Sequence, residues 1–172
     1  KTLQRGLPNL RTIASYTEYK DMKFVSGFVG NRLGGTLDWE YVKEVRDIWN
    51  GPMFLKGILH PADAEKAISI GIEGIGVSNH GARQFNAVKS GIASLKDIVP
   101  IAKGKAKIIY DGGIRSGLDI LKALTVGADF VLVGRPFIWG TAALGKKGGD
   151  HVAQLLLDDL VNNMMQVGCE TI

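Results

Sequence analysis

The fold is decided by an internal repeat: residues 53–79 read MFLKGILHPADAEKAISIGIEGIGVSN, and residues 109–135 read IYDGGIRSGLDILKALTVGADFVLVGR. The two stretches align over 27 positions without a gap, and seven positions are identical, including Gly57 with Gly113 and Gly71 with Gly127. Each copy has a short apolar run, then apolar residues at helical spacing, then a second apolar run. We interpret the repeat as two copies of a strand–helix–strand unit.

Strands and helices alternate along most of the chain. The apolar runs predict strands at residues 53–55, 74–77, 108–110 and 130–133. Helical spacing predicts helices at residues 36–49, 62–70, 92–103, 117–126 and 149–167, and a short helix near 16–28. Near-continuous apolar strands separated by helices are typical of an α/β fold with a parallel sheet that is buried on both faces.

The number of predicted strands indicates half of a larger fold. A parallel barrel needs about eight strands to close, and an open four-stranded sheet would leave two unpaired edges. The chain has 172 residues, and its length and strand count predict the C-terminal half (strands 5–8) of a (β/α)8 TIM barrel. We expect residues 36–172 to form this half-barrel and residues 1–35 to form a loop or connector before it.

Polar residues follow all four predicted strands. In parallel strand–helix units the carboxyl ends of the strands meet on one face, where barrels place their active sites. We therefore expect one site to be built from Lys56, Ser78-Asn79-His80, Asp111-Gly112-Gly113 and Gly134-Arg135.

The segment Ser78-Asn79-His80-Gly81-Ala82-Arg83-Gln84 carries the clearest chemistry. His80 can take a proton near neutral pH, and Arg83 can bind a carboxylate through two parallel hydrogen bonds. A lone histidine is more often a loop residue with a satisfied hydrogen bond. Its place at a strand end, three residues before Arg83, favours a catalytic base with a carboxylate clamp.

Two glycine-rich strand ends predict a phosphate site. Asp111-Gly112-Gly113-Ile114-Arg115 leads to a helix start near Gly117, and Gly134-Arg135-Pro136 follows the next strand. Backbone N–H groups, helix starts and an arginine in each loop can together bind an oxyanion. Either loop alone could be only a tight turn, and Lys56 alone could be a lysine that extends from the strand to solvent. Together they favour a bound phosphate, with the Lys56 ammonium near a cofactor ring.

The remaining composition excludes several classes. No apolar run approaches the roughly 20 residues that cross a bilayer, no secretory signal is visible, and the net charge of +4 is spread along the chain without aromatic-basic interleaving. We therefore expect neither membrane nor nucleic acid as a partner. Three scattered histidines and the single Cys169 match no metal-ligand spacing, and the single cysteine fits a reducing compartment such as the cytoplasm, with peroxisome and mitochondrion left open.

Several other residues have structural interpretations. We expect His60 to shape the loop after Lys56 and His151 to lie at the surface. Trp139 and the pair Met164-Met165 are expected to fill the core.

Taken together, Leu55-Lys56-Gly57, the segment 78–84, Asp111–Arg115 and Gly134-Arg135-Pro136 resemble the FMN-dependent L-2-hydroxy acid oxidoreductases. This is the glycolate oxidase and lactate oxidase family, and the resemblance runs from about Leu37 to Gly168. It implies FMN as cofactor. It also implies that His80 is the active-site base and that His80 and Arg83 bind substrate. The flavin-binding residues implied are Lys56, Ser78, Asp111, Gly112, Gly113, Ile114, Arg115, Gly134 and Arg135.

The resemblance also implies a reaction. An L-2-hydroxy acid is oxidised to the 2-oxo acid or its decarboxylated product, and oxygen or another acceptor then reoxidises the flavin. Residues 55–61 and 139–145 look most like lactate 2-monooxygenase and then lactate oxidase, which points to L-lactate and oxygen. Many relatives have Leu-Asp after the segment 78–84, whereas this chain has Phe85-Asn86.

The same resemblance implies that half of the active site lies outside these residues. The family's first four strands bring further flavin contacts, substrate-binding tyrosines and the aspartate that orients the catalytic histidine. We therefore expect the missing N-terminal half-barrel as a partner, a homo-oligomer, and little or no activity from the 172-residue chain alone. The alternative is a catalytically incomplete half-barrel that only self-associates, or binds FMN or phosphate.

Overall fold

The computed structural model describes residues 11–16, 22–33 and 37–172, and these residues divide into two compact units between Val42 and Lys43. The first unit contains the short helix α2 (Arg11–Ala14) and the helix α3 (Met22–Leu33). The sequence predicted a helix near 16–28. The helix α3 is present but begins and ends later than predicted, and residues 17–21 lie outside the described part. Helix α4 (Trp39–Ile48) begins where the Asp38 carboxylate accepts a hydrogen bond from the Tyr41 N–H at 2.9 Å.

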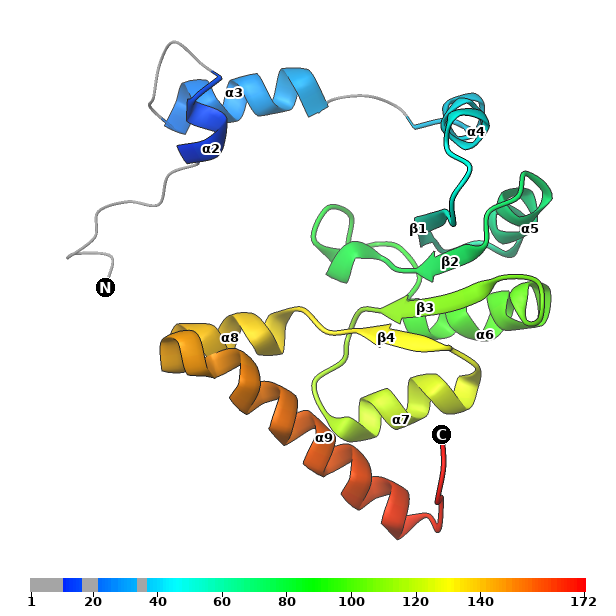
Figure 1. The fold of residues 1–172 in the computed structure, drawn as a ribbon, viewed down its shortest axis with the longest axis vertical. Helices are drawn as coiled ribbons and strands as arrows, with labels where there is room; N and C mark the ends of the chain where they lie inside the picture. The colour runs from blue at the N-terminus through cyan, green and yellow to red at the C-terminus, as the bar shows by residue number, and fades with distance from the viewer. Residues whose placement is uncertain (1–10, 17–21, 34–36) are drawn as a thin grey trace. The chain divides into compact units, whose positions relative to one another are not determined.

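The second unit is built on four parallel strands in the order β1-β2-β3-β4 (Figure 1). Their carboxyl ends therefore all lie at the same end of the sheet. These strands are β1 (Phe54–Ile58), β2 (Gly74–Val77), β3 (Lys107–Asp111) and β4 (Phe130–Leu132). The helices between them are α5 (Pro61–Ser69), α6 (Gly91–Ala102) and α7 (Gly117–Val126). The predicted half-barrel is therefore present, with most bounds within one or two residues of the expected ones.

One face of the sheet is packed and the other is open. Ile75, Val77 and Ile108 are buried, as are Leu95 and Ile98 of α6, and together they form the core. On the alternate face of the outer strands, Phe54, Phe130 and Leu132 stay exposed. Since residues alternate between the faces of a strand, the open face carries apolar side chains that a closed barrel would bury.

The internal repeat is confirmed for the helix and the second strand of each copy. A shift of 56 residues places α5 on α7 and β2 on β4. Gly71 and Gly127, which end the two helices, both have positive φ angles, at 82° and 125°. The first strands differ: β1 continues through Gly57, whereas the equivalent Gly113 has left β3 and forms a loop.

The repeat also places equivalent carboxylates at the amino ends of the strands. Glu73 accepts a hydrogen bond from the Met53 N–H at 2.8 Å, and Asp129 accepts one from the Ile108 N–H at 2.8 Å. Basic partners assist, since Glu73 pairs with Arg46 at 3.0 Å and Asp129 with Lys107 at 2.9 Å. These backbone hydrogen bonds are the main reason that the pKa of each carboxyl is lowered. Each carboxylate thus joins neighbouring strands.

This geometry predicts how acid affects stability. A carboxyl whose pKa is lower in the folded state stabilises the fold above its unfolded pKa, and this stabilisation is lost as the pH falls through the folded pKa. Asp129→Asn should lower the free energy of unfolding at neutral pH by about 1 kcal/mol and flatten its decline below about pH 4. Urea unfolding between pH 3 and 7, roughly the range over which carboxyls titrate, measures this. The exposed Asp47→Asn is the control, and an equal effect of both substitutions would refute the role of Asp129.

The C-terminal part contains a helix that the sequence prediction missed. After β4 come α8 (Arg135–Leu144), the short turn η2 (Gly145–Lys147) and α9 (Gly148–Gln166). Helix α9 packs on α7 and α8, as Figure 1 shows. Close packing is possible because Gly140 and Gly148 let the backbones of α8 and α9 meet, and a Cβ on either glycine would clash with the other helix. Trp139 is 55% exposed and Met165 is 73% exposed, so the prediction that both fill the core was wrong.

Candidate active site

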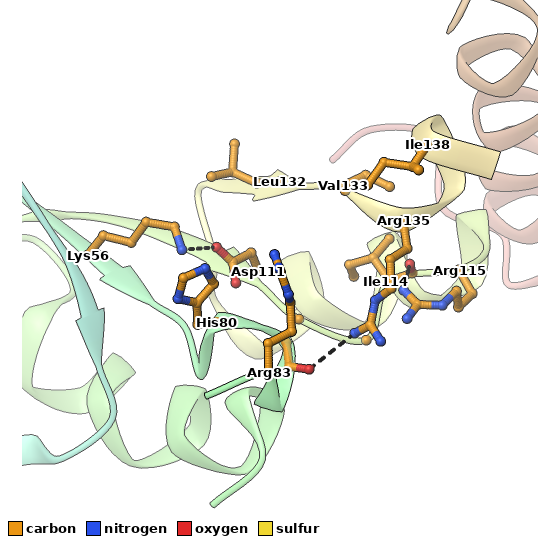
Figure 2. A pocket seen from close by; sticks show the side chains of 14 residues that line it. Lys56, His80, Arg83, Asp111, Ile114, Arg115, Leu132, Val133, Arg135 and Ile138 are labelled. Carbon is orange, nitrogen blue, oxygen red and sulfur yellow. Dashed lines mark hydrogen bonds and ion pairs between the residues drawn. The ribbon is translucent and has the colours of Figure 1, made fainter. Parts of the chain in front are cut away.

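A cavity of about 240 Å³ lies at the carboxyl ends of the strands. It is lined by Lys56, His80, Gly81, Arg83, residues 111–115, residues 132–135 and Ile138. In Figure 2, Lys56, Asp111 and His80 lie toward one end, while Arg115 and Arg135 lie toward the other. The structure thus brings together the site residues predicted from the sequence except Ser78 and Asn79, which lie next to the cavity but outside its lining. Within the described ranges, no group of three or more His, Cys, Asp or Glu residues is placed so that it could hold a metal ion.

Ser78 joins the ends of three strands. Its side chain is 2% exposed, and its hydroxyl donates to the Asp111 carboxylate at 2.5 Å. The same oxygen accepts from the Lys56 ammonium at 2.9 Å and from the His80 N–H at 3.1 Å. Lys56 also pairs with Asp111 at 2.7 Å. Because one donated and two accepted hydrogen bonds occupy a hydroxyl fully, Ser78 positions Lys56 and Asp111 from below the cavity.

His80 and Arg83 lie on one short turn directly after β2. The turn η1 (His80–Ala82) begins after Asn79, whose side-chain oxygen accepts a hydrogen bond from the Gly81 N–H at 3.0 Å. Both the His80 ring and the Arg83 guanidinium are exposed at the cavity (Figure 2). A proton acceptor and a bidentate carboxylate ligand are therefore side by side.

The glycine-rich loop after β3 is held from below by a tyrosine. Gly112 and Gly113 have φ angles of 106° and 86°, which other residues rarely adopt, and the Tyr110 hydroxyl donates to the Gly112 carbonyl. Burial raises the pKa of Tyr110, and the nearby Asp111 and Asp119 carboxylates raise it further, so the hydroxyl stays a donor. The loop can therefore bring its backbone close to a ligand without moving.

The helix start after this loop does not serve as an anion site, which corrects the expectation from the sequence. The Asp159 carboxylate of α9 accepts from the Gly117 N–H at 2.6 Å and from the Leu118 N–H at 3.3 Å. The Ser116 hydroxyl and the Asp119 carboxylate form a capping box at the same end. A carboxylate thus already occupies the N-terminus of α7, and an anion would meet repulsion there.

The start of α8 is free of such caps. Gly134 precedes the helix without a side-chain cap, and a Cβ on Gly134 would meet nothing within 4 Å. Arg135 begins the helix, and its guanidinium lies 3.5 Å from the Gly81 carbonyl. The Arg115 guanidinium stacks 5.2 Å from the centre of the Trp139 ring and donates to the Ile114 carbonyl at 2.6 Å. Two arginines and an uncapped helix start therefore lie together at one end of the cavity, an arrangement that could bind an anion.

Four residues around the site were given no positioning role by the sequence analysis. Asn79 shapes the turn of His80, Tyr110 supports the glycine loop, Trp139 stacks on Arg115, and Asp159 caps α7. Only Asn79 had a local signal, since asparagine after a strand often bonds the backbone two residues on. The other contacts join elements distant in sequence. As for the remaining histidines, His60 accepts from the Ala62 N–H and caps α5, as a loop-shaping residue should, and His151 is exposed as expected.

Comparison with known proteins decides which family this site represents. The family of FMN-dependent dehydrogenases matches residues 3–172. The chain belongs to the FMN-dependent dehydrogenase family. It is 44% identical to an L-lactate oxidase of Lysinibacillus sphaericus over 87% of this chain and 39% of the relative. It is 39% identical to the human 2-hydroxyacid oxidase 1 over 90% of this chain and 42% of the relative.

Solved structures of related flavoenzymes show the same half-barrel. A mandelate oxidase variant with an FMN monooxide adduct is 44% identical, with a TM-score of 0.75 over 79% of this chain and 43% of that one. A mandelate oxidase variant with benzaldehyde has a TM-score of 0.77 and 38% identity over 98% of this chain and 46% of that one. The chain therefore spans less than half the length of these relatives and represents part of a TIM barrel. Among the described residues, no helix is both long and apolar enough to cross a membrane.

Proposed function

We propose that this chain supplies the FMN-binding and substrate-activating half of an enzyme that oxidises an L-2-hydroxy acid, with L-lactate as substrate and oxygen as acceptor. One observation carries the proposal: His80, Arg83, Lys56 and the two arginines Arg115 and Arg135 line a single cavity, where they could act as base, carboxylate clamp, ammonium and anion-binding end. The L-lactate oxidase among the relatives supports lactate and oxygen, and the 2-oxo acid or its decarboxylated product is the expected product.

The residues present fit FMN. A phosphate would lie at the end formed by Arg115, Arg135 and the uncapped start of α8. The glycine loop, held by Tyr110, allows a close approach of the backbone to the ribityl chain. Lys56 would face the ring at the other end, where its ammonium stabilises negative charge. The ion pair with Asp111 and the hydrogen bond to Ser78 keep this ammonium in place.

The substrate would lie against the turn that carries His80 and Arg83. Arg83 binds the carboxylate through two N–H donors and orients the 2-carbon. His80 would accept one proton, from either the α-carbon or the hydroxyl group. When bound, FMN would supply the two-electron acceptor: the hydroxy acid would lose two electrons and two hydrogens, one as the proton that His80 takes and the other to the flavin or the solvent, and oxygen would serve as the final acceptor of the two electrons.

The open face of the sheet is evidence that the partner of this chain is the first four strands of the barrel. Phe130 is 64% exposed, and Phe54 and Leu132 are also exposed on the outer strands, whose edges are unpaired in the described residues. Four further parallel strands would pair with both edges and bury these side chains. A second copy of this chain is the alternative occupant, and it would make the half-barrel a self-associating module. Sedimentation velocity of the purified chain, with and without the first four strand–helix units, distinguishes the two.

The anion-binding end gives a test of the cofactor. Because riboflavin lacks only the phosphate of FMN, loss of the Arg115 stack should weaken FMN but not riboflavin. Trp139→Leu should raise the Kd for FMN about threefold to tenfold, in keeping with the strength of a cation–π contact. Quenching of flavin fluorescence measures both ligands.

Trp49→Leu is the matched control, because Trp49 is also 55% exposed and lies away from the cavity lining. An equal loss of both ligands in Trp139→Leu would contradict the phosphate assignment. Failure of the unaltered chain to bind FMN at all, alone or with the first four strand–helix units, would contradict the proposed function.

A further inference from the structure

We propose that Asn79 is a positioning residue that locks residues 80–82 in a left-handed turn and so presents His80 and Arg83 together to the substrate. This inference rests on the proposed function and names a device that the site depends on. Asn79 itself is outside the cavity lining, so it acts through its neighbours.

The turn is left-handed at three consecutive residues. The φ angles are 55° at His80, 68° at Gly81 and 56° at Ala82. In the described part of the chain, His80 and Ala82 are the only residues other than glycine with positive φ. A left-handed conformation is unfavourable for a residue with a Cβ, and such strain persists only where the surroundings impose it.

Asn79 supplies two of the hydrogen bonds that impose this turn. Its side-chain oxygen accepts from the Gly81 N–H at 3.0 Å, and its carbonyl accepts from the Ala82 N–H at 2.9 Å. The Ser78 hydroxyl accepts from the His80 N–H, so all three left-handed residues have their N–H groups bound by the two preceding residues. Arg135 adds a donor to the Gly81 carbonyl from the other side.

The Asn79 side chain also lies near the glycine-rich loop after β3. A Cβ on Gly112 would lie 3.1 Å from the Asn79 side-chain oxygen, and Gly112 has a φ of 106°. The Asn79 side chain thus lies between the turn of His80 and the backbone of Gly112, so near that a side chain at Gly112 would crowd it. Its amide fixes the turn relative to the flavin-binding residues, which is what a base and a clamp acting on one substrate require.

A thermodynamic cycle tests the locking of the turn without flavin. If Ala82 is strained, Ala82→Gly should raise the folding equilibrium constant about fivefold, a change measured by urea unfolding. If Asn79 imposes the strain, the gain from Ala82→Gly should fall to less than about twofold in the Asn79→Ala background. Equal gains in both backgrounds, or a loss of stability in Ala82→Gly, would overturn the proposal.

Hydrogen exchange at single amides provides a readout that a general loss of stability would not mimic. Asn79→Ala should speed exchange of the Gly81 N–H about tenfold relative to neighbouring amides of β2, whereas Asn79→Asp, which keeps a side-chain oxygen, should retain most of the protection. Unchanged exchange at Gly81 in Asn79→Ala refutes the lock.

The link to catalysis is tested in the FMN-loaded protein with its first four strand–helix units. Asn79→Ala should lower kcat/KM for L-lactate at least about tenfold, and Asn79→Asp should restore part of it, since both groups on the turn are displaced together. If the thermodynamic cycle shows the coupling but Asn79→Ala leaves kcat/KM unchanged, Asn79 does not present His80 and Arg83 to the substrate, and that part of the proposal is refuted. Absence of lactate oxidation in the unaltered protein would instead contradict the proposed function, while the cycle would still report on the turn.

Discussion

The 172-residue chain, purified alone and supplied with FMN, is expected to oxidise L-lactate at least about 10⁴-fold more slowly than the same chain combined with its first four strand–helix units. His80 is exposed, and within the described residues no carboxylate is hydrogen-bonded to its imidazole. In triad-type sites, losing the group that orients a histidine costs about 10⁴ in rate. The open face of the sheet would also leave a bound substrate and cofactor in contact with water, which would weaken every electrostatic interaction in the cavity.

Peroxide release and pyruvate formation, measured at equal flavin occupancy, report this difference. Addition of the first four strand–helix units as a separate polypeptide should recover the activity if the edges of β1 and β4 accept them. Rapid turnover by the chain without any partner would show that one wall of the barrel suffices, and would contradict the assignment of half a site.

The second large effect concerns His80. In the assembled FMN-loaded protein, His80→Gln should slow reduction of the flavin by L-lactate about 10²- to 10⁴-fold, the usual contribution of a positioned general base. Glutamine can still donate and accept hydrogen bonds, so FMN binding should be retained. Anaerobic stopped-flow absorbance isolates this step from reoxidation by oxygen.

The control for this substitution is His151→Gln. His151 is exposed on α9 and lies outside the cavity lining, so its replacement should leave the rate unchanged. A His80→Gln protein that reduces flavin as fast as the unaltered one would require another residue to accept the substrate proton.

The sequence predicted those parts of the fold whose signals are local. The strand Gly74–Val77 and the helix Gly117–Val126 have the predicted bounds, because each combines a continuous apolar pattern with clear stop signals. Helix α8 was missed because Gly134-Arg135-Pro136 reads as a turn, although proline is well tolerated in the first turn of a helix. Trp139 was assigned to the core for its size, but the half-barrel leaves it exposed, stacked on Arg115.

The sequence predicted which residues line the cavity but not the hydrogen bonds and ion pairs that join them. Parallel strand ends had to meet at one edge, so the gathering of Lys56, His80 and Asp111 followed from the strand pattern alone. The sequence did not predict that the N-terminus of α7 is closed to an anion. The residue that caps it, Asp159, belongs to α9 and lies 42 residues later in the sequence. The three hydrogen bonds of the Ser78 hydroxyl were likewise not predictable, because they depend on the relative positions of three strands.

The proposed function requires, as its central claim, that this cavity binds FMN so that an L-2-hydroxy acid reduces it. Anaerobic mixing of L-lactate with the FMN-loaded barrel, assembled from this chain and the first four strand–helix units, tests the claim most directly. The flavin absorbance should bleach, and the bleaching should be slowed by His80→Gln but not by His151→Gln. A protein that holds FMN firmly yet stays oxidised with L-lactate and with other L-2-hydroxy acids would contradict it.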